Sequence, residues 1–252
     1  MYQISYYEMH LGAHANRKLA NQRRKEAPTL RGVLGIPYAE LTQLIAESEL
    51  AELPKDIEIL NSLYSRSLEE GLIAIALVAV SVLEQPQLAL ELAERWLPYV
   101  DDVQTADALG HLVIGPALLS LGLSSDERLQ DPELTNPFHR RAEVMALMAA
   151  MPEPVRGPAA AALRETLQAD EITFVEEAMD AHIANGLLVV LRDPSPIVRK
   201  AFSSVLRAWT ACSHDAVQSW VSESVPDRHP WVKDGLSRGL REHRRRMRKK
   251  DQ

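Results

Sequence analysis

The stretch "SPIVRKAFSSVLRAW" at residues 195–209 combines a helical apolar stripe with a fixed set of cations. Its apolar residues recur every three to four positions, the spacing of one helix face, at Ile197, Ala201 and Val205. Its cations occupy other positions of the same cylinder, at Arg199, Lys200 and Arg207. The stretch therefore predicts a helix that packs on one side and carries positive charge on another.

Two other segments repeat this sequence pattern, "NPFHRRAEVMALMA" at 136–149 and "HPWVKDGLSRGLREH" at 229–243. In the first, Arg140 and Arg141 stand where Arg199 and Lys200 stand, and in the second, Arg241 matches Arg207. A unit of this kind cannot bury its apolar stripe alone, so neighbouring copies must stack. The repeat predicts an all-α fold, an α-solenoid of HEAT-like helix pairs whose inner helices line a concave groove.

The rest of the chain fits this fold class. Aromatic residues make up only 5% of the 252 residues, and no alternating strand pattern or two-residue hairpin turn is evident. We expect one domain over 1–252 with a basic tail at 244–252. The periodic segments predict helices at 14–26, 38–48, 55–65, 67–83, 86–98, 102–120, 137–151, 157–168, 171–191, 196–210, 213–223 and 230–248.

Charge is distributed unevenly along the chain, although the net charge is −7. Residues 40–102 hold 13 acidic and 3 basic side chains, whereas residues 227–252 hold 10 basic and 4 acidic ones. The negative net charge argues against a protein whose entire surface is positively charged. A local strip of cations remains suited to a polyanion such as nucleic acid.

Several classes of protein are disfavoured by the sequence. The single cysteine, Cys212, excludes an internal disulfide framework and fits a reducing bacterial cytosol. The apolar run at 71–83 is too short to span a bilayer, so we expect a buried helix and no membrane partner. His10 and His14 have a metal-ligand spacing but no evident third ligand, so neither a metal nor a cofactor is expected.

Five segments, in order, resemble the DNA alkylation repair enzymes of the AlkD type, which are HEAT-like repeat DNA glycosylases. Each is degenerate, and together they extend over most of the chain: "ANRKLANQRRKEAPTLRGVLGIPYAEL" (15–41), "ILNSLYSRSLEEGLIAIALVAV" (59–80), "VDDVQTADALGHLVIGPALL" (100–119), "NPFHRRAEVMAL" (136–147) and "IVRKAFSSVLRAW" (197–209). The resemblance implies that the protein, expected to be a monomer, excises cationic alkylated purines such as 3-methyladenine and 7-methylguanine from duplex DNA. It also implies that the lesion stays in the duplex while the enzyme grips the backbone.

The resemblance assigns roles to individual residues. The essential aspartate of the family falls on Asp107, which would stabilise an oxocarbenium-like sugar and position water. The DNA-facing cations fall on Arg141, Lys200 and Arg207, which would contact phosphates. The adjacent cations complete the candidate DNA-binding set, and they are Arg140 and Arg199.

Other interpretations of these residues remain open at this stage. Asp107 is also explained as a helix cap or as an acid that interacts with the helix dipole, and the cations as solvated or salt-bridged surface residues. The sequence also has Val103 and Ser204 where the family has aromatic side chains. The alternative function is therefore a non-catalytic HEAT-like repeat protein that binds DNA or a protein partner.

Overall fold

The protein is built of helices in a computed structural model that describes residues 10–26, 29–46, 56–152, 176–225 and 229–250. No strand occurs in these residues, and the one isolated β-bridge joins Gly32 to Ser67. The predicted all-α class is confirmed. The helices in chain order are α2 (Arg17–Glu26), α3 (Tyr38–Ala46), α4 (Ile57–Arg66), α5 (Leu68–Val80), α6 (Pro86–Trp96), η1 (Leu97–Tyr99), α7 (Val103–Leu109), η2 (Gly110–Ile114), α8 (Gly115–Ser120), α9 (Ser125–Leu129), α10 (Pro137–Ala146), η3 (Leu147–Ala150), α13 (Glu176–Val190), α14 (Pro196–Cys212), α15 (His214–Ser224) and α16 (Pro230–Lys250).

Local sequence explains where the repeated helices begin. Asn136 caps α10, because its side-chain Oδ1 accepts a hydrogen bond from the Phe138 amide at 2.8 Å. Ser195 caps α14 in the same way through the Ile197 amide at 3.2 Å. A proline follows each cap at the first helical position, where the missing amide costs nothing.

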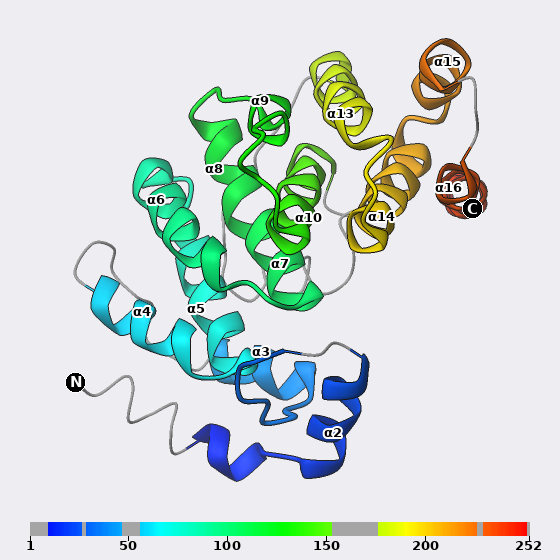
Figure 1. Cartoon of the computed structure of the whole chain (residues 1–252). Helices are drawn as coiled ribbons and strands as arrows, with labels where there is room; N and C mark the ends of the chain where they lie inside the picture. Colours follow the sequence, from blue (N-terminus) through cyan, green and yellow to red (C-terminus); the bar gives the residue numbers. More distant parts are fainter. Residues whose placement is uncertain (1–9, 27–28, 47–55, 153–175, 226–228, 251–252) are drawn as a thin grey trace.

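The helices are arranged in two rows that follow the chain across the molecule (Figure 1). In the first row, α5 contacts α7, α7 contacts α10, α10 contacts α14, and α14 contacts α16. In the second row, α6 contacts α8, α9 contacts α13, and α13 contacts α15. Three successive helices of the first row thus carry the repeated sequence pattern, α10, α14 and α16.

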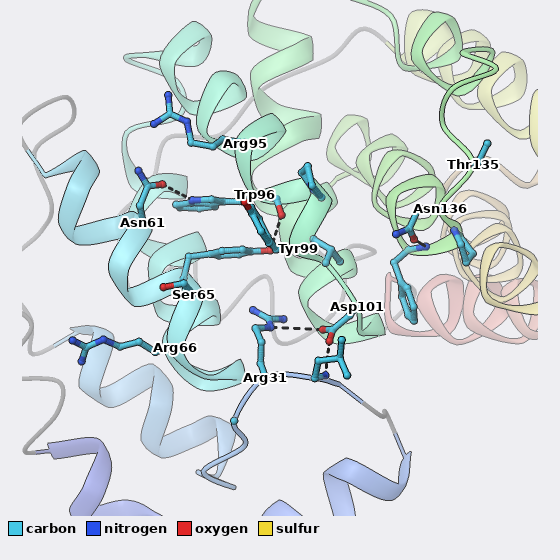
Figure 2. Close-up of a pocket in the computed structure, with 17 residues that line it drawn as sticks. Arg31, Asn61, Ser65, Arg66, Arg95, Trp96, Tyr99, Asp101, Thr135 and Asn136 are labelled. Carbon is cyan, nitrogen blue, oxygen red and sulfur yellow. Dashed lines mark hydrogen bonds and ion pairs between the residues drawn. The ribbon is translucent and has the colours of Figure 1, made fainter.

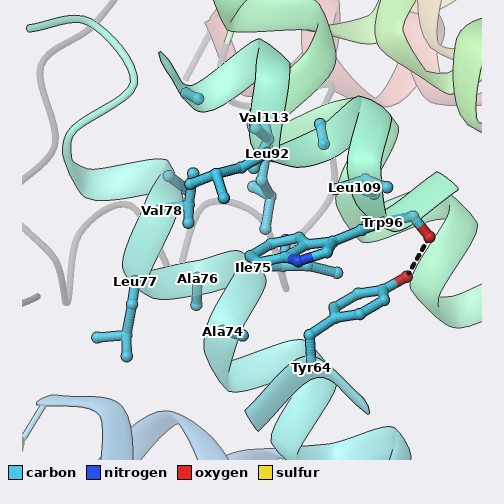
Figure 3. Packing of buried hydrophobic residues seen from close by; sticks show 14 of the residues in the cluster. Tyr64, Ala74, Ile75, Ala76, Leu77, Val78, Leu92, Trp96, Leu109 and Val113 are labelled. Atoms are coloured by element: carbon cyan, nitrogen blue, oxygen red, sulfur yellow. Dashed lines mark hydrogen bonds between the residues drawn. The ribbon is translucent and has the colours of Figure 1, made fainter. Parts of the chain in front are cut away.

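Two large apolar clusters form most of the core, one from Leu11 to Ala146 and one from Leu129 to Val232. A third, small cluster joins Ala20, Val33 and Leu68. The apolar run at 71–83 lies largely in α5 and is buried, as predicted, and its side chains pack against Trp96 of α6 (Figure 3). No helix among the described residues is both long enough and apolar enough to cross a membrane.

The segment predicted as one helix at 102–120 contains a π-helical turn, η2, between α7 and α8. A π turn brings residues five apart onto the same face. Gly110 and Gly115 accordingly both face α10, where an added Cβ would lie 2.0 Å from the Ala142 carbonyl oxygen and 2.3 Å from that of Ala146. Only glycine permits this approach, which sets how closely α7 lies against α10.

The other differences from prediction concern short or terminal segments. The five-residue helix α9 was not predicted, because one turn is too short to show a periodic pattern. The basic residues 244–250 continue α16 as helix. The helix predicted at 157–168 and the first part of that at 171–191 lie outside the described residues.

Candidate functional site

The start of α7 is fixed by the side chain of Asp102. Its Oδ1 accepts hydrogen bonds from the amides of Gln104 and Thr105, both at 2.8 Å. Its Oδ2 accepts one from the Arg31 Nη2 atom at 2.5 Å, and the same Nη2 donates to the Thr105 hydroxyl at 2.5 Å. The residue that caps α7 is therefore Asp102, and the interpretation of Asp107 as a helix cap is wrong.

Asp107 lies one turn further along α7, on the side that faces α10. Its two carboxylate oxygens accept from one guanidinium, Oδ1 from Arg141 Nε at 2.6 Å and Oδ2 from Arg141 Nη2 at 2.8 Å. The third nitrogen, Arg141 Nη1, donates to the Ile197 carbonyl of α14 at 2.9 Å. Two predicted site residues are thus joined in a bidentate ion pair, which also ties α7 and α10 to α14.

The pair is open to solvent on one side only. The Arg141 side chain is 8% exposed, whereas the Asp107 side chain is 34% exposed. Exclusion of water by the surrounding protein raises the pKa of Asp107 above its usual range, and the hydrogen bonds and charge of Arg141 act in the opposite direction. Each carboxylate oxygen has two lone pairs, so the exposed part of Asp107 retains acceptor capacity beyond its bonds to Arg141.

Arg140 and Arg199 meet at the turn that precedes α14. The Nε of Arg140 donates to the Asp193 carboxylate at 2.7 Å, and the Nε of Arg199 donates to the Asp193 carbonyl at 2.7 Å. The Arg199 guanidinium also lies 4.5 Å from the ring centroid of Trp231, which is a cation–π contact. Both candidate DNA-binding cations are therefore engaged within the protein, where they hold the start of α14.

Lys200 and Arg207 lie on α14 beyond this turn, and both are exposed. Arg207 forms an ion pair with Glu242 of α16, with its Nε 2.9 Å from the carboxylate. Around this pair lies a small hollow of about 250 Å³, lined by Arg207, Arg238, Arg241, Glu242 and Arg245. We call these five residues the arginine hollow, and its net charge is positive.

Sequence reasoning missed three residues of the arginine hollow, Arg238, Arg241 and Arg245, as site candidates. A signal for them was present, because the repeat matches Arg207 with Arg241 and thereby places both on packed, equivalent helices. The hollow combines side chains from neighbouring members of the first row. It is therefore a product of helix stacking rather than of the sequence of either helix alone.

The positions where the sequence departs from the resembled pattern carry no aromatic face. Val103 is half-buried at the first position of α7, and the exposed Ser204 donates its hydroxyl to the Lys200 carbonyl at 3.0 Å. Trp209 does not replace them, because it is buried and donates its Nε1 to Asp180 of α13 at 2.6 Å.

Metal ligands do not gather in the part of the chain that the structure describes, where no group of three or more suitable side chains is found. Of the predicted histidine pair, His14 contacts Glu40 of α3, with 2.9 Å between Nδ1 and the carboxylate.

Comparison with known proteins agrees with the sequence resemblance at the level of the family. None of the curated proteins matches the chain. The family model described as "DNA alkylation repair enzyme" matches residues 7–245, which is nearly the whole chain. With its all-helical fold and a match of this length, the chain belongs to the DNA alkylation repair enzyme family.

Proposed function

We propose that the protein is a DNA glycosylase that removes cationic alkylated purines, such as 3-methyladenine and 7-methylguanine, from duplex DNA. Family membership suggests repair of alkylation damage. The observation that carries the proposal is the carboxylate of Asp107, which Arg141 holds by both oxygens while a third of the side chain stays exposed. The two rows of helices would form an α-solenoid, and the first row would line its groove.

The chemistry requires little from the protein beyond a fixed negative charge and a water. An alkylated purine is positively charged, so the C1′–N bond breaks with its electron pair moving to the base, which leaves neutral. The sugar becomes an oxocarbenium-like cation, which the Asp107 carboxylate stabilises. A water oxygen then bonds to C1′, and its proton passes to the carboxylate or to solvent.

The bidentate contact with Arg141 serves this step by orientation. Because Arg141 is buried and also bonded to the Ile197 carbonyl, it cannot swing away without leaving polar groups unpaired. The carboxylate is therefore held in one orientation before substrate arrives. Preorganisation of this kind avoids a reorganisation cost during the reaction.

Grip on the DNA backbone is the natural role of the arginine hollow and of the exposed Lys200. Four arginines and one glutamate leave a net charge of +3, and guanidinium groups match phosphate oxygens in a bidentate manner. The exposed cations of α16 continue this surface toward the end of the helix. Binding through these groups would be independent of base sequence and sensitive to salt.

Base release tests the enzymatic proposal directly. Asp107→Asn keeps the size of the side chain and removes its charge, so we expect release of 7-methylguanine from methylated duplex DNA to fall by roughly 100-fold or more. The matched control is Asp215→Asn, at an exposed carboxylate of α15, which should release base at the wild-type rate. Equal rates for wild type and Asp107→Asn would refute the assigned role.

A salt titration of duplex affinity tests the backbone contact. Arg245→Ala should lower the slope of log affinity against log salt by about 0.9, the loss of one phosphate contact. Arg192→Ala removes an exposed arginine outside the hollow and should leave the slope unchanged. A wild-type slope near zero would remove the argument for phosphate binding.

The rival function is DNA binding without cleavage, and one observation favours it. Val103 and Ser204 offer no aromatic face that would stabilise a cationic sugar. Such contacts contribute on the order of 1–2 kcal/mol when they are desolvated. Wild-type protein that binds duplex DNA with a steep salt dependence but releases no base would establish this rival.

A further inference from the structure

A second cavity, separate from the Asp107–Arg141 pair and from the arginine hollow, lies between α4, α6, η1 and the start of α10. Its volume is about 1050 Å³, which is at the upper end of the range for small-molecule sites. The loop that carries Leu30 and Arg31 closes one side of it (Figure 2). We call this cavity the α4–α6 pocket.

The apolar part of the pocket is unusually exposed. Leu30 is 98% exposed and Tyr99 is 69% exposed, and these are the two most exposed large apolar side chains among the described residues. Both line the pocket, together with the half-buried Phe138. Exposed apolar groups gathered at one concave site are typical of a surface that a ligand covers.

The rings behind this rim are held rigidly. Trp96 stacks on Tyr64 with 4.5 Å between ring centroids and 4° between their planes (Figure 3). Trp96 Nε1 donates to Asn61 at 2.7 Å (Figure 2). The Arg31 guanidinium lies 5.3 Å from the Tyr64 ring centroid, on the pocket side of the loop. The wall of the pocket is thus preorganised, which lowers the entropic cost of binding.

The charged part of the pocket is cationic on balance. Three arginines and one aspartate line it, Arg31, Arg66, Arg95 and Asp101. Arg66 and Arg95 lie at the same end, with Asn61 and Ser65 between them, whereas Asn136 lies at the opposite end (Figure 2). Arg66 also forms an ion pair with Glu70 of the next helix, with 3.8 Å between Nη1 and the carboxylate, whereas Arg95 is exposed. Two cations beside amide and hydroxyl groups are suited to a phosphate, which accepts hydrogen bonds from all of them.

Arg31 adds a donor that the protein itself does not satisfy. Its side chain is more than nine-tenths buried, and its Nε makes no hydrogen bond within the described residues. The Asp101 Oδ1 atom is 3.7 Å from Nε, which is too long for a hydrogen bond. An unsatisfied buried donor is costly. Because the unpaired nitrogens of Arg31 are closed off from solvent, Arg31 contributes positive charge to the wall of the pocket rather than a direct hydrogen bond to a ligand.

We propose that the α4–α6 pocket binds a nucleotide, with its planar base against Tyr99 and Leu30 and its phosphate between Arg66 and Arg95. A nucleotide is the common ligand chemistry that combines a flat apolar ring, hydrogen-bonding edges and a negative charge. It is supplied either by a free mononucleotide or by an unpaired nucleotide of a DNA strand. Because none of the pocket residues belongs to the excision site, this binding stands apart from the proposed catalysis.

The test uses 2-aminopurine, a fluorescent base whose emission is quenched when it stacks on an aromatic ring. Four probes are titrated with full-length protein: the 2-aminopurine mononucleotide, its nucleoside, a duplex with one unpaired terminal 2-aminopurine nucleotide, and a duplex with the same base paired internally. We expect saturable quenching for the mononucleotide or the unpaired terminus, at least tenfold tighter than for the nucleoside. The probe with the higher affinity identifies the source of the ligand.

Variants at the exposed rim identify the site without disturbing the core. Tyr99→Ala should weaken binding about tenfold, which is the usual effect of one lost base–aromatic stack. Arg95→Ala should bring the affinities for mononucleotide and nucleoside close together, because it removes a phosphate contact. Arg192→Ala, an exposed arginine outside the pocket, should bind as wild type.

Two outcomes would overturn the proposal. One is the absence of saturable quenching with both the mononucleotide and the unpaired terminus, and the other is wild-type affinity in Tyr99→Ala and Arg95→Ala together. Both outcomes are independent of the base-release assay, which uses methylated paired DNA and reports on Asp107.

Discussion

Two arginine–carboxylate pairs in the molecule have the same chemistry but opposite access to water. In the N-terminal region, Arg23 of α2 pairs with Glu69 of α5 at 2.5 Å, and the two side chains are 6% and 0% exposed. In the central region, Arg141 is equally buried, but a third of Asp107 is open. A closed pair can only hold elements together, whereas a half-open one can also act on a ligand.

The remaining partners of each carboxylate reinforce the difference. Glu69 also accepts hydrogen bonds from the amides of Leu34 and Gly35, both at 2.9 Å, so it accepts three bonds within the protein and has no side exposed to water. Among the described residues, the hydrogen bonds of the Asp107 carboxylate come from Arg141, one to each oxygen. The first pair therefore fastens the loop after α2 to α5, and the second leaves acceptor capacity where the proposed chemistry needs it.

The largest change in stability is expected when the arginine of the closed pair is removed. Arg23→Ala leaves the Glu69 carboxylate buried without its counter-ion, and we expect the free energy of unfolding to fall by about 3–5 kcal/mol. Urea denaturation of full-length protein measures this change. Lys18→Ala, at an exposed position of the same helix, should change stability by less than about 0.5 kcal/mol. A loss below 1 kcal/mol for Arg23→Ala would show that the two amide contacts alone hold Glu69.

The sequence identified the two residues of the half-open pair but not the contact between them. The family resemblance selected both Asp107 and Arg141, and the periodic segments predicted helices that start at 137 and 196, where α10 and α14 begin. The direct contact between the two residues was not predicted. Helical spacing reports which residues share a face, but it does not report which face meets a helix 34 residues away.

The close approach of Gly110 and Gly115 to α10 also escaped prediction, because it depends on the π turn. A regular helix over 102–120 would place residues 110 and 115 on different sides of the cylinder, because five residues are well over one α-helical turn. The sequence offered one clue, two glycines five residues apart, which is ambiguous without the partner helix. Arg140 and Arg199 illustrate the same limit, since their shared partner Asp193 lies on neither of their helices.

An intermediate loss of stability is expected when the helices that carry the half-open pair are forced apart. Gly110→Ala places a methyl group against the Ala142 carbonyl oxygen, a backbone atom that cannot rotate away. We expect a loss of about 2–3 kcal/mol in urea denaturation, together with slower base release, because α7 must move away from α10. Gly12→Ala is the matched control, since an added Cβ there meets nothing within 4 Å. Equal stability for the two variants would mean that the close approach is not required.

The smallest expected effect is a shift in the pH dependence of base release, and it distinguishes the half-open pair from the closed one. Removing Arg141 leaves a carboxylate that can reach water, so Arg141→Met should destabilise the protein less than Arg23→Ala does. Its main consequence is electrostatic: Arg141 lowers the pKa of Asp107 against the raising effect of burial, so its loss should raise that pKa further. Because the proposed reaction needs the ionised carboxylate, base release is lost as the pH falls through this pKa. The acid limb of the pH–rate profile should therefore move to higher pH in Arg141→Met, and less so in Arg141→Lys, which retains a positive charge. An acid limb that stays in place in Arg141→Met would mean that a group other than Asp107 controls the rate.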